Sequence, residues 1–400
     1  MNPLSIFSIK PIFFNATQTV ILLAFLTALS STGCKTTATL SDKAGIDSTT
    51  VFSPSSSYAS MRIPALVVTK KGTLLAFCEG RVGTASDWAD MDLLMRRSKD
   101  GGKTWGSHTV IAKRKSGQPT SNATPIVDRD GTIHLLYQRD YARAYYTFSK
   151  DDGKTWSKAT DITYAFDAFK PEYDWKVLAP GPGHSIQLTS GRLLVPVWLS
   201  DPAKIKPKRS HAPSCIATIY SDDLGRTWKR GEIIANNSET FKNPSETMAI
   251  QLNDGRVMVN IRNVSEVHRR GVSYSNDGIS AWSKPVFDDE LFEPVCMATI
   301  IRLQDGQQSP MLFINPDSEI PGAAPLPKYP RKNLTAKLSY DEGQNWPIKK
   351  VINQGPSGYA DVAIGPDGTI YCLYETNSGK DWNYSLVLKK ISLKWIRSDQ

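Results

Sequence analysis

One unit recurs six times along the chain: an apolar segment, a turn that contains glycine, and a second apolar segment. Two apolar runs around such a turn are typical of a β-hairpin. The turn glycines recur about every sixty residues, which is a spacing typical of repeat architectures. The hairpins are expected at residues 66–77, 126–137, 186–198, 250–262, 300–314 and 362–375, with turns at Gly72, Gly131, Gly191, Gly255, Gly306 and Gly368. The fold must therefore accommodate six equivalent β units.

A second repeat follows five of the hairpins and begins Ser-x-Asp, as in "SKDGGKTW" at residues 98–105. Its Asp can accept hydrogen bonds from the turn's own amides, its Gly can take a positive φ, and its Trp can pack beneath the turn. A calcium loop is the alternative, but no copy has the six-ligand register or the closing bidentate Glu. The phrase therefore predicts a rigid structural turn. The other copies lie at residues 149–156, 221–228, 275–282 and 339–346, of which the one at 275–282 is degraded.

Six hairpins, five of them extended by the Ser-x-Asp phrase, predict six four-stranded sheets. Radial packing of such sheets gives a six-bladed β-propeller, an all-β fold that protects strand edges by closure. The sixth unit lacks the phrase, and the segment before Arg62 is a candidate for its missing outer strand. The propeller is predicted to cover residues 58–396.

The N-terminal part differs in character from the repeats. An apolar run from Val20 to Leu29 is too short to span a bilayer and is typical of a signal peptide. Gly33 and Cys34 resemble the end of a bacterial lipoprotein signal, in which the cysteine is acylated, and plain secretion is the alternative. We therefore expect a signal peptide at residues 1–34, a Ser/Thr-rich flexible tether at 35–57, and export to the periplasm or the cell surface.

The net charge of +9 would suit an acidic ligand or an anionic surface. The basic residues are scattered among the strands, and the densest run, residues 204–211, predicts a solvated loop, so no nucleic-acid partner is expected. Membrane contact is expected only through an N-terminal lipid. The spacing of Cys78, Cys215, Cys296 and Cys372 fits neither a zinc site nor a disulfide framework, which favours buried free thiols.

Strand direction predicts where a shared site would lie. In an up-and-down sheet, the hairpin turns and the Ser-x-Asp turns share one face, so a site must be built on the other. That face receives residues just before a first strand, just after a second strand, and in the loops that follow second strands. Any one charged or aromatic residue at this face could form an ordinary ion pair or be a half-buried aromatic. Several arginines around one axis, however, repel each other unless an anion binds there. The candidates are Arg62, Arg81, Asp87, Glu246, Arg262, Arg331, Tyr359 and Glu375.

From about Tyr58 to Trp395, these motifs together resemble the exo-α-sialidases of the six-bladed propeller superfamily. The Ser-x-Asp phrase is similar to the Asp box of that family, and "RIPAL" at residues 62–66 is similar to its first arginine motif. "RKNLTAKLSYDEGQNW" at 331–346 and "GPSGYADVA" at 355–363 are similar to its C-terminal signature. The chain departs from the pattern in its fourth Asp box and in the missing sixth box, which concerns blade stability and not chemistry.

The resemblance implies a role for each candidate. It implies that Arg62, Arg262 and Arg331 bind a carboxylate, that Glu375 orients Arg62, and that Arg81 lies near the sugar's 4-hydroxyl. It also implies that Tyr359 is the nucleophile, Glu246 its base, and Asp87 the acid/base. The implied reaction is retaining hydrolysis of terminal α-linked sialic acids, with sialylated glycans as partners and no metal or organic cofactor.

The chemistry of the substrate agrees with this set of residues. A sialic acid carries its carboxylate on the anomeric carbon, where it would repel an Asp or Glu nucleophile, and a neutral phenol avoids that repulsion. Three alternatives stay open. A non-catalytic propeller that binds sialoglycans would need the arginines but not Asp87, Tyr359 and Glu246 together. A glycosidase or transferase for a related ulosonic acid such as Kdn would use the same residues, and an envelope scaffold would need none of them.

Overall fold

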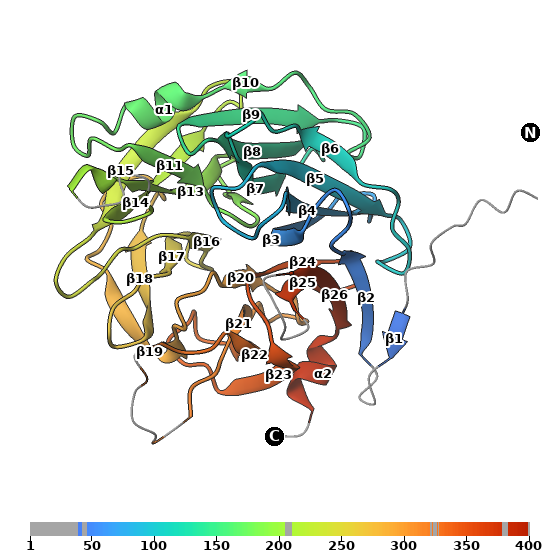
Figure 1. Cartoon of the computed structure of the whole chain (residues 1–400). Coiled ribbons are helices and arrows are strands. Elements are labelled where there is room, and N and C mark those ends of the chain that lie inside the picture. Colours follow the sequence, from blue (N-terminus) through green and yellow to red (C-terminus); the bar gives the residue numbers. More distant parts are fainter. Residues whose placement is uncertain are drawn as a thin grey trace, which may run out of the picture. The chain divides into compact units, whose positions relative to one another are not determined.

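The computed structural model describes residues 39–41, 46–204, 210–320, 322, 326, 328–377 and 383–398. All of them belong to one compact unit, residues 37–400. The predicted signal peptide and Cys34 lie outside the described residues, as does most of the basic run at 204–211. Within the described part, six antiparallel sheets surround a common axis (Figure 1). The six-bladed propeller predicted from the repeats is confirmed.

The first five sheets are meanders in which strands that follow one another in sequence lie side by side, and the sixth combines a C-terminal meander with N-terminal strands. In the third blade the innermost strand is split into two pieces, β11 and β12, which both pair with β13. The first three blades comprise β3 (Ser60–Val68), β4 (Leu74–Arg81), β5 (Met91–Ser98) and β6 (Thr109–Ala112); β7 (Thr120–Val127), β8 (Ile133–Arg139), β9 (Arg143–Ser149) and β10 (Thr160–Asp161); and β11 (Val177–Pro180), β12 (Ile186–Gln187), β13 (Leu193–Ser200), β14 (Ser214–Ser221) and β15 (Lys229–Asn236). The last three comprise β16 (Thr247–Gln251), β17 (Val257–Ile261), β18 (Arg269–Ser275) and β19 (Val286–Phe292); β20 (Thr299–Arg302), β21 (Met311–Pro316), β22 (Lys332–Ser339) and β23 (Ile348–Pro356); and β24 (Ala360–Ile364), β25 (Ile370–Thr376) and β26 (Ser385–Ile391) with β2 (Asp47–Phe52) and β1 (Thr39–Ser41).

Two short α-helices complete the described part, α1 (Thr163–Asp167) after the second blade and α2 (Leu393–Arg397) after the sixth. Among the described residues, no helix has the length and apolar character needed to cross a membrane.

The N-terminal strand β2 closes the ring by pairing with β26, so that it forms the outer part of the sixth blade (Figure 1). The expectation that a segment before Arg62 would supply this strand is confirmed. The predicted flexible tether at residues 35–57 is wrong for β1 and β2. Thr and Val favour strands, and the side chains of Val51 and Phe52 are buried against the sixth blade, which a Ser/Thr-rich composition did not reveal.

The core consists of apolar side chains between neighbouring blades. The strands second from the axis are buried along their whole length, as in β4 and β13, whereas β23 on the outer edge alternates between half-buried and exposed residues around one buried position. The four cysteines of the described part are free and buried, as predicted.

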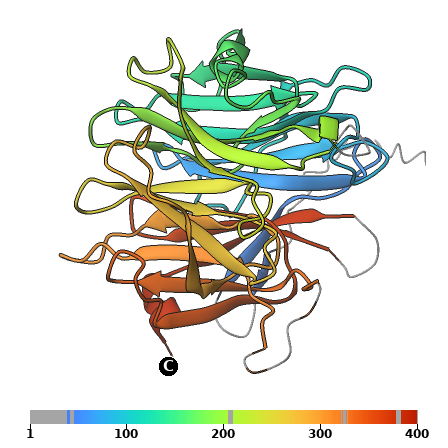
Figure 2. The same ribbon diagram turned by 90° about the vertical axis from the view of Figure 1, so that its left-hand side faces the viewer.

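The Asp boxes lie between the third and fourth strands, at the same face as the hairpin turns. In the first box, Asp100 accepts hydrogen bonds from the Thr104 amide at 3.0 Å and from the Ser98 hydroxyl at 2.7 Å. Gly102 takes a φ of 82° and donates its amide to Ser98 at 2.9 Å. In the degraded fourth box, Asp277 still caps the turn through the Ile279 amide at 2.9 Å. The side view shows strands that run between two faces where the loops collect, so the boxes are remote from any site on the opposite face (Figure 2).

Candidate active site

The eight predicted site residues meet at the face opposite the Asp boxes. Seven of them line one cavity of about 120 Å³ at the axis, and the eighth, Glu375, lies behind Arg62. They come from four of the six blades, which explains their wide separation in sequence. The cavity is lined by Arg62, Ile63, Glu79, Arg81, Asp87, Asn122, Tyr141, Trp198, His211, Glu246, Arg262, Arg331 and Tyr359.

Glu375, near the end of β25, fixes the position of Arg62. Its two oxygens accept from Nε and Nη2 of Arg62, both at 3.1 Å, and its carboxylate also accepts the amides of Ile63 at 2.8 Å and Tyr359 at 3.2 Å. Gly358 permits this arrangement, because a Cβ there would lie 2.4 Å from Glu375 Oε2. Ile63 has a φ of 57°, a strained value for a β-branched residue, at the bulge that turns Arg62 toward the axis. A fully paired carboxylate therefore holds one guanidinium rigidly.

Three arginines surround the ring of Tyr359. The guanidinium carbons of Arg62, Arg262 and Arg331 lie 5.3, 5.8 and 5.3 Å from its centroid. Arg62 and Arg262 each pair with a glutamate, whereas Arg331 donates to the neutral carbonyl of Val295 at 2.6 Å. The cluster therefore keeps an excess of positive charge at the bottom of the cavity, where a planar anion could accept several charge-assisted hydrogen bonds.

The hydroxyl of Tyr359 is linked to a base. It donates to the two carboxylate oxygens of Glu246, at 2.6 and 2.7 Å, and accepts from Nη1 of Arg262 at 2.6 Å. Arg262 also forms an ion pair with Glu246. Burial and the charge of Glu246 outweigh the neighbouring arginines and raise the pKa of Tyr359 well above its usual value. The phenol is therefore neutral in the free protein, with a carboxylate placed to take its proton.

Asp87 lies in the β4–β5 loop at the mouth of the cavity, with 42% of its side chain exposed. Its Oδ1 accepts from Nη1 of Arg81 at 2.8 Å and lies 3.6 Å from Nη1 of Arg62. Burial alone would raise the pKa of Asp87, but the charges of Arg81, Arg62 and, when it is protonated, His211 outweigh burial and lower the pKa to about 2. The carboxylate is thus ionised in the free protein at neutral pH.

Arg81, at the end of β4, is almost fully buried. It donates to Glu79 Oε2 through Nε at 3.0 Å and Nη2 at 2.6 Å, so only Nη1 turns toward Asp87. Glu79 in turn accepts the amide of Asn122 at 3.1 Å, which links the first two blades.

Most of this chain is similar to known proteins. The profile of the BNR repeat-like domain family matches residues 72–372. A sialidase of Micromonospora viridifaciens is 31% identical over 357 residues, which cover 80% of this chain and 50% of that protein. The chain belongs to the BNR repeat-like domain family. Sialidase-3 of Rattus norvegicus is 26% identical over 374 residues and is covered to 87%.

Solved sialidase structures share the fold of this family member. The Hadza microbial sialidase Hz136 superposes with a TM-score of 0.68 at 24% identity, over 84% of this chain and 66% of that one. Trypanosoma rangeli sialidase, solved as a covalent intermediate with 2,3-difluorosialic acid, superposes with a TM-score of 0.65 at 21% identity, over 90% of this chain and 57% of that one. The chain thus spans about half of the Micromonospora protein and under two thirds of these two solved chains.

Sequence reasoning missed one wall of the cavity. Asn122, Tyr141, Trp198 and His211 come from the second and third blades and lie opposite the arginine cluster. Tyr141 and Trp198 follow or end second strands, so the rule that found the other residues could have found them. His184, in the segment before β12, is bound through Nδ1 to Asp361 Oδ1 at 2.6 Å and does not line the cavity.

No His, Cys, Asp or Glu cluster suited to a metal ion occurs in the described ranges. The expectation that the chemistry needs no metal or organic cofactor stays a prediction.

Proposed function

We propose that this chain is an exo-α-sialidase that releases terminal α-linked sialic acids from glycans with retention, through a covalent intermediate on Tyr359. The observation that carries the proposal is the contact of Tyr359 with both oxygens of Glu246 inside a ring of three arginines. A sialic acid needs this combination, because its carboxylate attracts arginines and repels an anionic nucleophile. The named relatives, which are sialidases, support the same substrate class.

In the proposed first step, the substrate carboxylate binds Arg62, Arg262 and Arg331. The bond between the anomeric carbon and the aglycone oxygen breaks, and that oxygen takes a proton from Asp87. The Tyr359 oxygen bonds to the anomeric carbon and gives its proton to Glu246.

In the proposed second step, water attacks the anomeric carbon and gives a proton to Asp87. The bond to the Tyr359 oxygen breaks, and that oxygen recovers its proton from Glu246. Two displacements at one carbon give net retention, and both carboxyl groups return to their starting states. The covalent intermediate named for the Trypanosoma rangeli sialidase supports this route.

Asp87 must hold a proton before the first step, although two arginines keep it ionised in the free protein. A bound substrate carboxylate would offset the charge of Arg62 and so raise the proton affinity of Asp87. A lectin would have no use for an acid, a phenol and its base in one cavity, which favours hydrolysis over binding alone.

The decisive test is a fluorogenic α-sialoside assay, followed by trapping with a 3-fluorosialyl fluoride and mass spectrometry of the labelled peptide. We expect turnover and a sugar adduct on Tyr359. Absence of turnover on every sialoside would refute the activity, and an adduct on another residue would refute the mechanism alone.

We also propose that the protein is exported and held at a membrane by acylated Cys34. The apolar run at 20–29 and the sequence "STGC" at 31–34 support this proposal. Cys34→Ala should move the protein from the detergent phase to the aqueous phase after phase separation. Equal partitioning of variant and parent would exclude the lipid anchor at Cys34 and leave plain secretion as the alternative.

A further inference from the structure

The two oxygens of the Asp87 carboxylate have different neighbours. Oδ1 receives both arginine contacts, from Arg81 at 2.8 Å and Arg62 at 3.6 Å. Oδ2 faces Nδ1 of His211 at 4.0 Å. A guanidinium can only donate, so Oδ1 remains an acceptor. Oδ2 is therefore the oxygen that can carry the proton required in the proposed first step.

His211 is held opposite Oδ2 by aromatic rings. The residue lies in the β13–β14 connection, and its ring centroid is 5.0 Å from that of Trp88, 4.8 Å from that of Tyr141 and 5.0 Å from that of Trp198. These three rings come from the first, second and third blades. The imidazole is thus fixed by packing and not by hydrogen bonds to Asp87.

The charges that face His211 oppose one another. Asp87 and Glu246 are acidic, while Arg81 from β4 and Arg262 after β17 are basic. Burial lowers the pKa of His211 and outweighs the two acidic neighbours, so the ring is neutral at neutral pH. A neutral imidazole has one donor and one acceptor nitrogen, and the partner of one nitrogen decides the state of the other.

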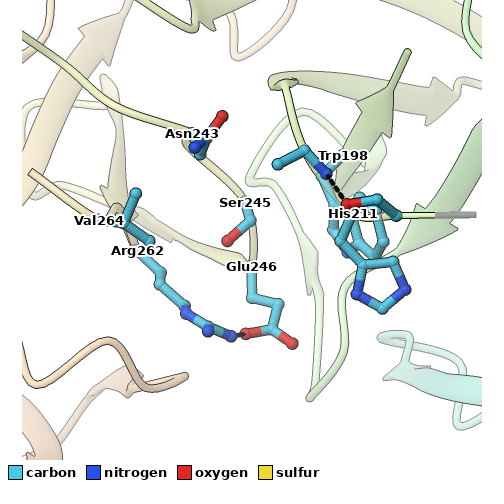
Figure 3. A pocket seen from close by; sticks show the side chains of 9 residues that line it. Trp198, His211, Asn243, Ser245, Glu246, Arg262 and Val264 are labelled. Carbon is cyan, nitrogen blue, oxygen red and sulfur yellow. Dashed lines mark hydrogen bonds and ion pairs between the residues drawn. The ribbon is translucent and has the colours of Figure 1, made fainter. Parts of the chain in front are cut away.

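His211 also borders a second cavity of about 170 Å³ between the third and fourth blades, which we call the side pocket. Figure 3 shows Trp198 and His211 on one side of it, with Asn243, Glu246 and Arg262 on the other. Four buried side-chain atoms of its lining have no hydrogen-bond partner among the described residues. They are Trp198 Nε1, His211 Nε2, Asn243 Oδ1 and Arg262 Nε.

Unpaired buried polar atoms at one cavity indicate a partner that fills it. Two of these atoms are donors (Trp198 Nε1 and Arg262 Nε), one is an acceptor (Asn243 Oδ1), and the imidazole nitrogen can be either. Such a mixed set matches hydroxyl groups, which can both donate and accept. A hydroxyl that accepts from Nε2–H leaves Nδ1 of His211 with its lone pair toward Oδ2 of Asp87.

We propose that His211 is a positioning residue that favours the protonated form of Asp87 when a hydroxyl group occupies the side pocket. The inference rests on the proposed function. The lone pair of Nδ1 stabilises a proton on Oδ2 and destabilises the carboxylate. At 4.0 Å, Nδ1 is too distant for a hydrogen bond that would compete for the proton. The proton stays available to the leaving oxygen, and the imidazole itself gains and loses none.

The test compares two substrates that differ only in leaving group, 3′-sialyllactose and 4-methylumbelliferyl sialoside. His211→Phe keeps an aromatic ring among Trp88, Tyr141 and Trp198 but removes both nitrogens. We expect kcat for sialyllactose to fall by about tenfold or more, since it needs protonation, and kcat for the methylumbelliferyl sialoside to fall by less than about threefold. The basic limb of the sialyllactose pH profile should move to lower pH, because Asp87 then loses its proton more easily.

Two further variants separate this role from packing. His211→Asn can place an amide oxygen near Nδ1 and should recover part of the sialyllactose rate, and it supplies the comparison should His211→Phe fold poorly. In the Asp87→Ala background, His211→Phe should add no further loss. The matched control is His268→Phe: His268 lies in the corresponding loop of the fourth blade, 4.8 Å from the ring of Tyr329, away from Asp87. It should leave both rates and the pH profile unchanged.

Equal losses on both substrates, with an unmoved pH profile and additive losses with Asp87→Ala, would overturn the role of His211. A parent protein that releases sialic acid from neither substrate would instead overturn the proposed function. A sialyllactose whose side chain is shortened by periodate and borohydride distinguishes the source of the hydroxyl. With this substrate, the parent should match the kcat and pH profile of His211→Phe if the substrate side chain supplies the hydroxyl. It should keep its own pH profile if water supplies the hydroxyl.

Discussion

At the scale of single residues, the chemistry of Tyr359 depends on opposing charges at short range. Glu246 and burial make the phenol hard to ionise, while Arg62, Arg262 and Arg331 favour the anion. The phenol is consequently neutral at rest, and the base that must take its proton is already in hydrogen-bond contact. Attack and proton transfer can therefore occur together, without a free phenolate in the resting protein.

Tyr359→Phe removes one oxygen and leaves the ring between the arginines. We expect kcat to fall by about a thousandfold or more, as for other lost nucleophiles, while the melting temperature stays near that of the parent. The matched control is Tyr384→Phe, because the Tyr384 ring lies 4.9 Å from the guanidinium carbon of Arg62 but does not line the cavity. Near-parental turnover in Tyr359→Phe would exclude the tyrosine nucleophile.

Asp87 gives a pH dependence of stability with a definite sign. Its pKa in the folded protein is about 2, below the ordinary value of 3.8, so ionised Asp87 stabilises the fold above about pH 4. That contribution is lost as the pH falls from about 4 to about 2. Asp87→Asn should therefore melt below the parent at pH 7, and the gap should narrow between pH 4 and pH 2.5. A gap that is constant with pH would show that the arginines do not act on Asp87.

At the scale of elements, the Asp boxes and the catalytic loops lie at opposite ends of the same strands. The boxes differ in how deeply their tryptophans pack: Trp228 is 2% exposed, whereas Trp105 is only partly buried. The contribution of this repeated motif to the free energy of unfolding therefore differs from blade to blade.

Trp228→Ala should lower the free energy of unfolding by about 3 to 5 kcal/mol, because it empties a buried aromatic site beside Tyr146. Trp105→Ala, the control, should cost clearly less. Turnover per folded molecule should be unchanged in both variants, as measured by chemical denaturation and by active-site titration with the fluorosialyl fluoride. Loss of turnover without loss of stability would contradict the structural role of the boxes.

The elements also show what a sequence can reveal here. Hairpins were predictable because apolar runs and turn glycines repeat, and the face of the site followed from strand direction alone. The split strand β11–β12 and helix α1 carry no such repeat and were not foreseen. Strand β2 was mistaken for a tether, since its Ser and Thr are polar while Val51 and Phe52 provide the burial. His211 could not be identified from the sequence, because its role depends on contacts with rings of the first and second blades as well as of its own, the third.

At the scale of the whole molecule, the ring is joined both at its axis and at its outer edge. At the axis, the buried carboxylate of Asp361 accepts the Leu66 amide at 2.9 Å, the His184 amide at 2.8 Å and the Thr299 hydroxyl at 3.0 Å. One side chain of the sixth blade thereby binds the first, third and fifth blades, two residues after Tyr359. At the edge, β2 returns to β26 and joins the start of the propeller to its end.

Closure by β2 predicts where a truncated propeller becomes unstable. A chain that begins at residue 46 loses β1 but keeps β2, and should melt like one that begins at residue 37. A chain that begins at residue 58 loses the burial of Val51 and Phe52, worth about 3 to 6 kcal/mol together, and exposes the edge of β26. It should melt markedly lower and aggregate through that edge. Because β2 forms no part of the cavity lining, the protein that remains folded should keep its turnover. Equal melting of the chains that begin at 46 and 58 would mean that the ring is held by its axis alone.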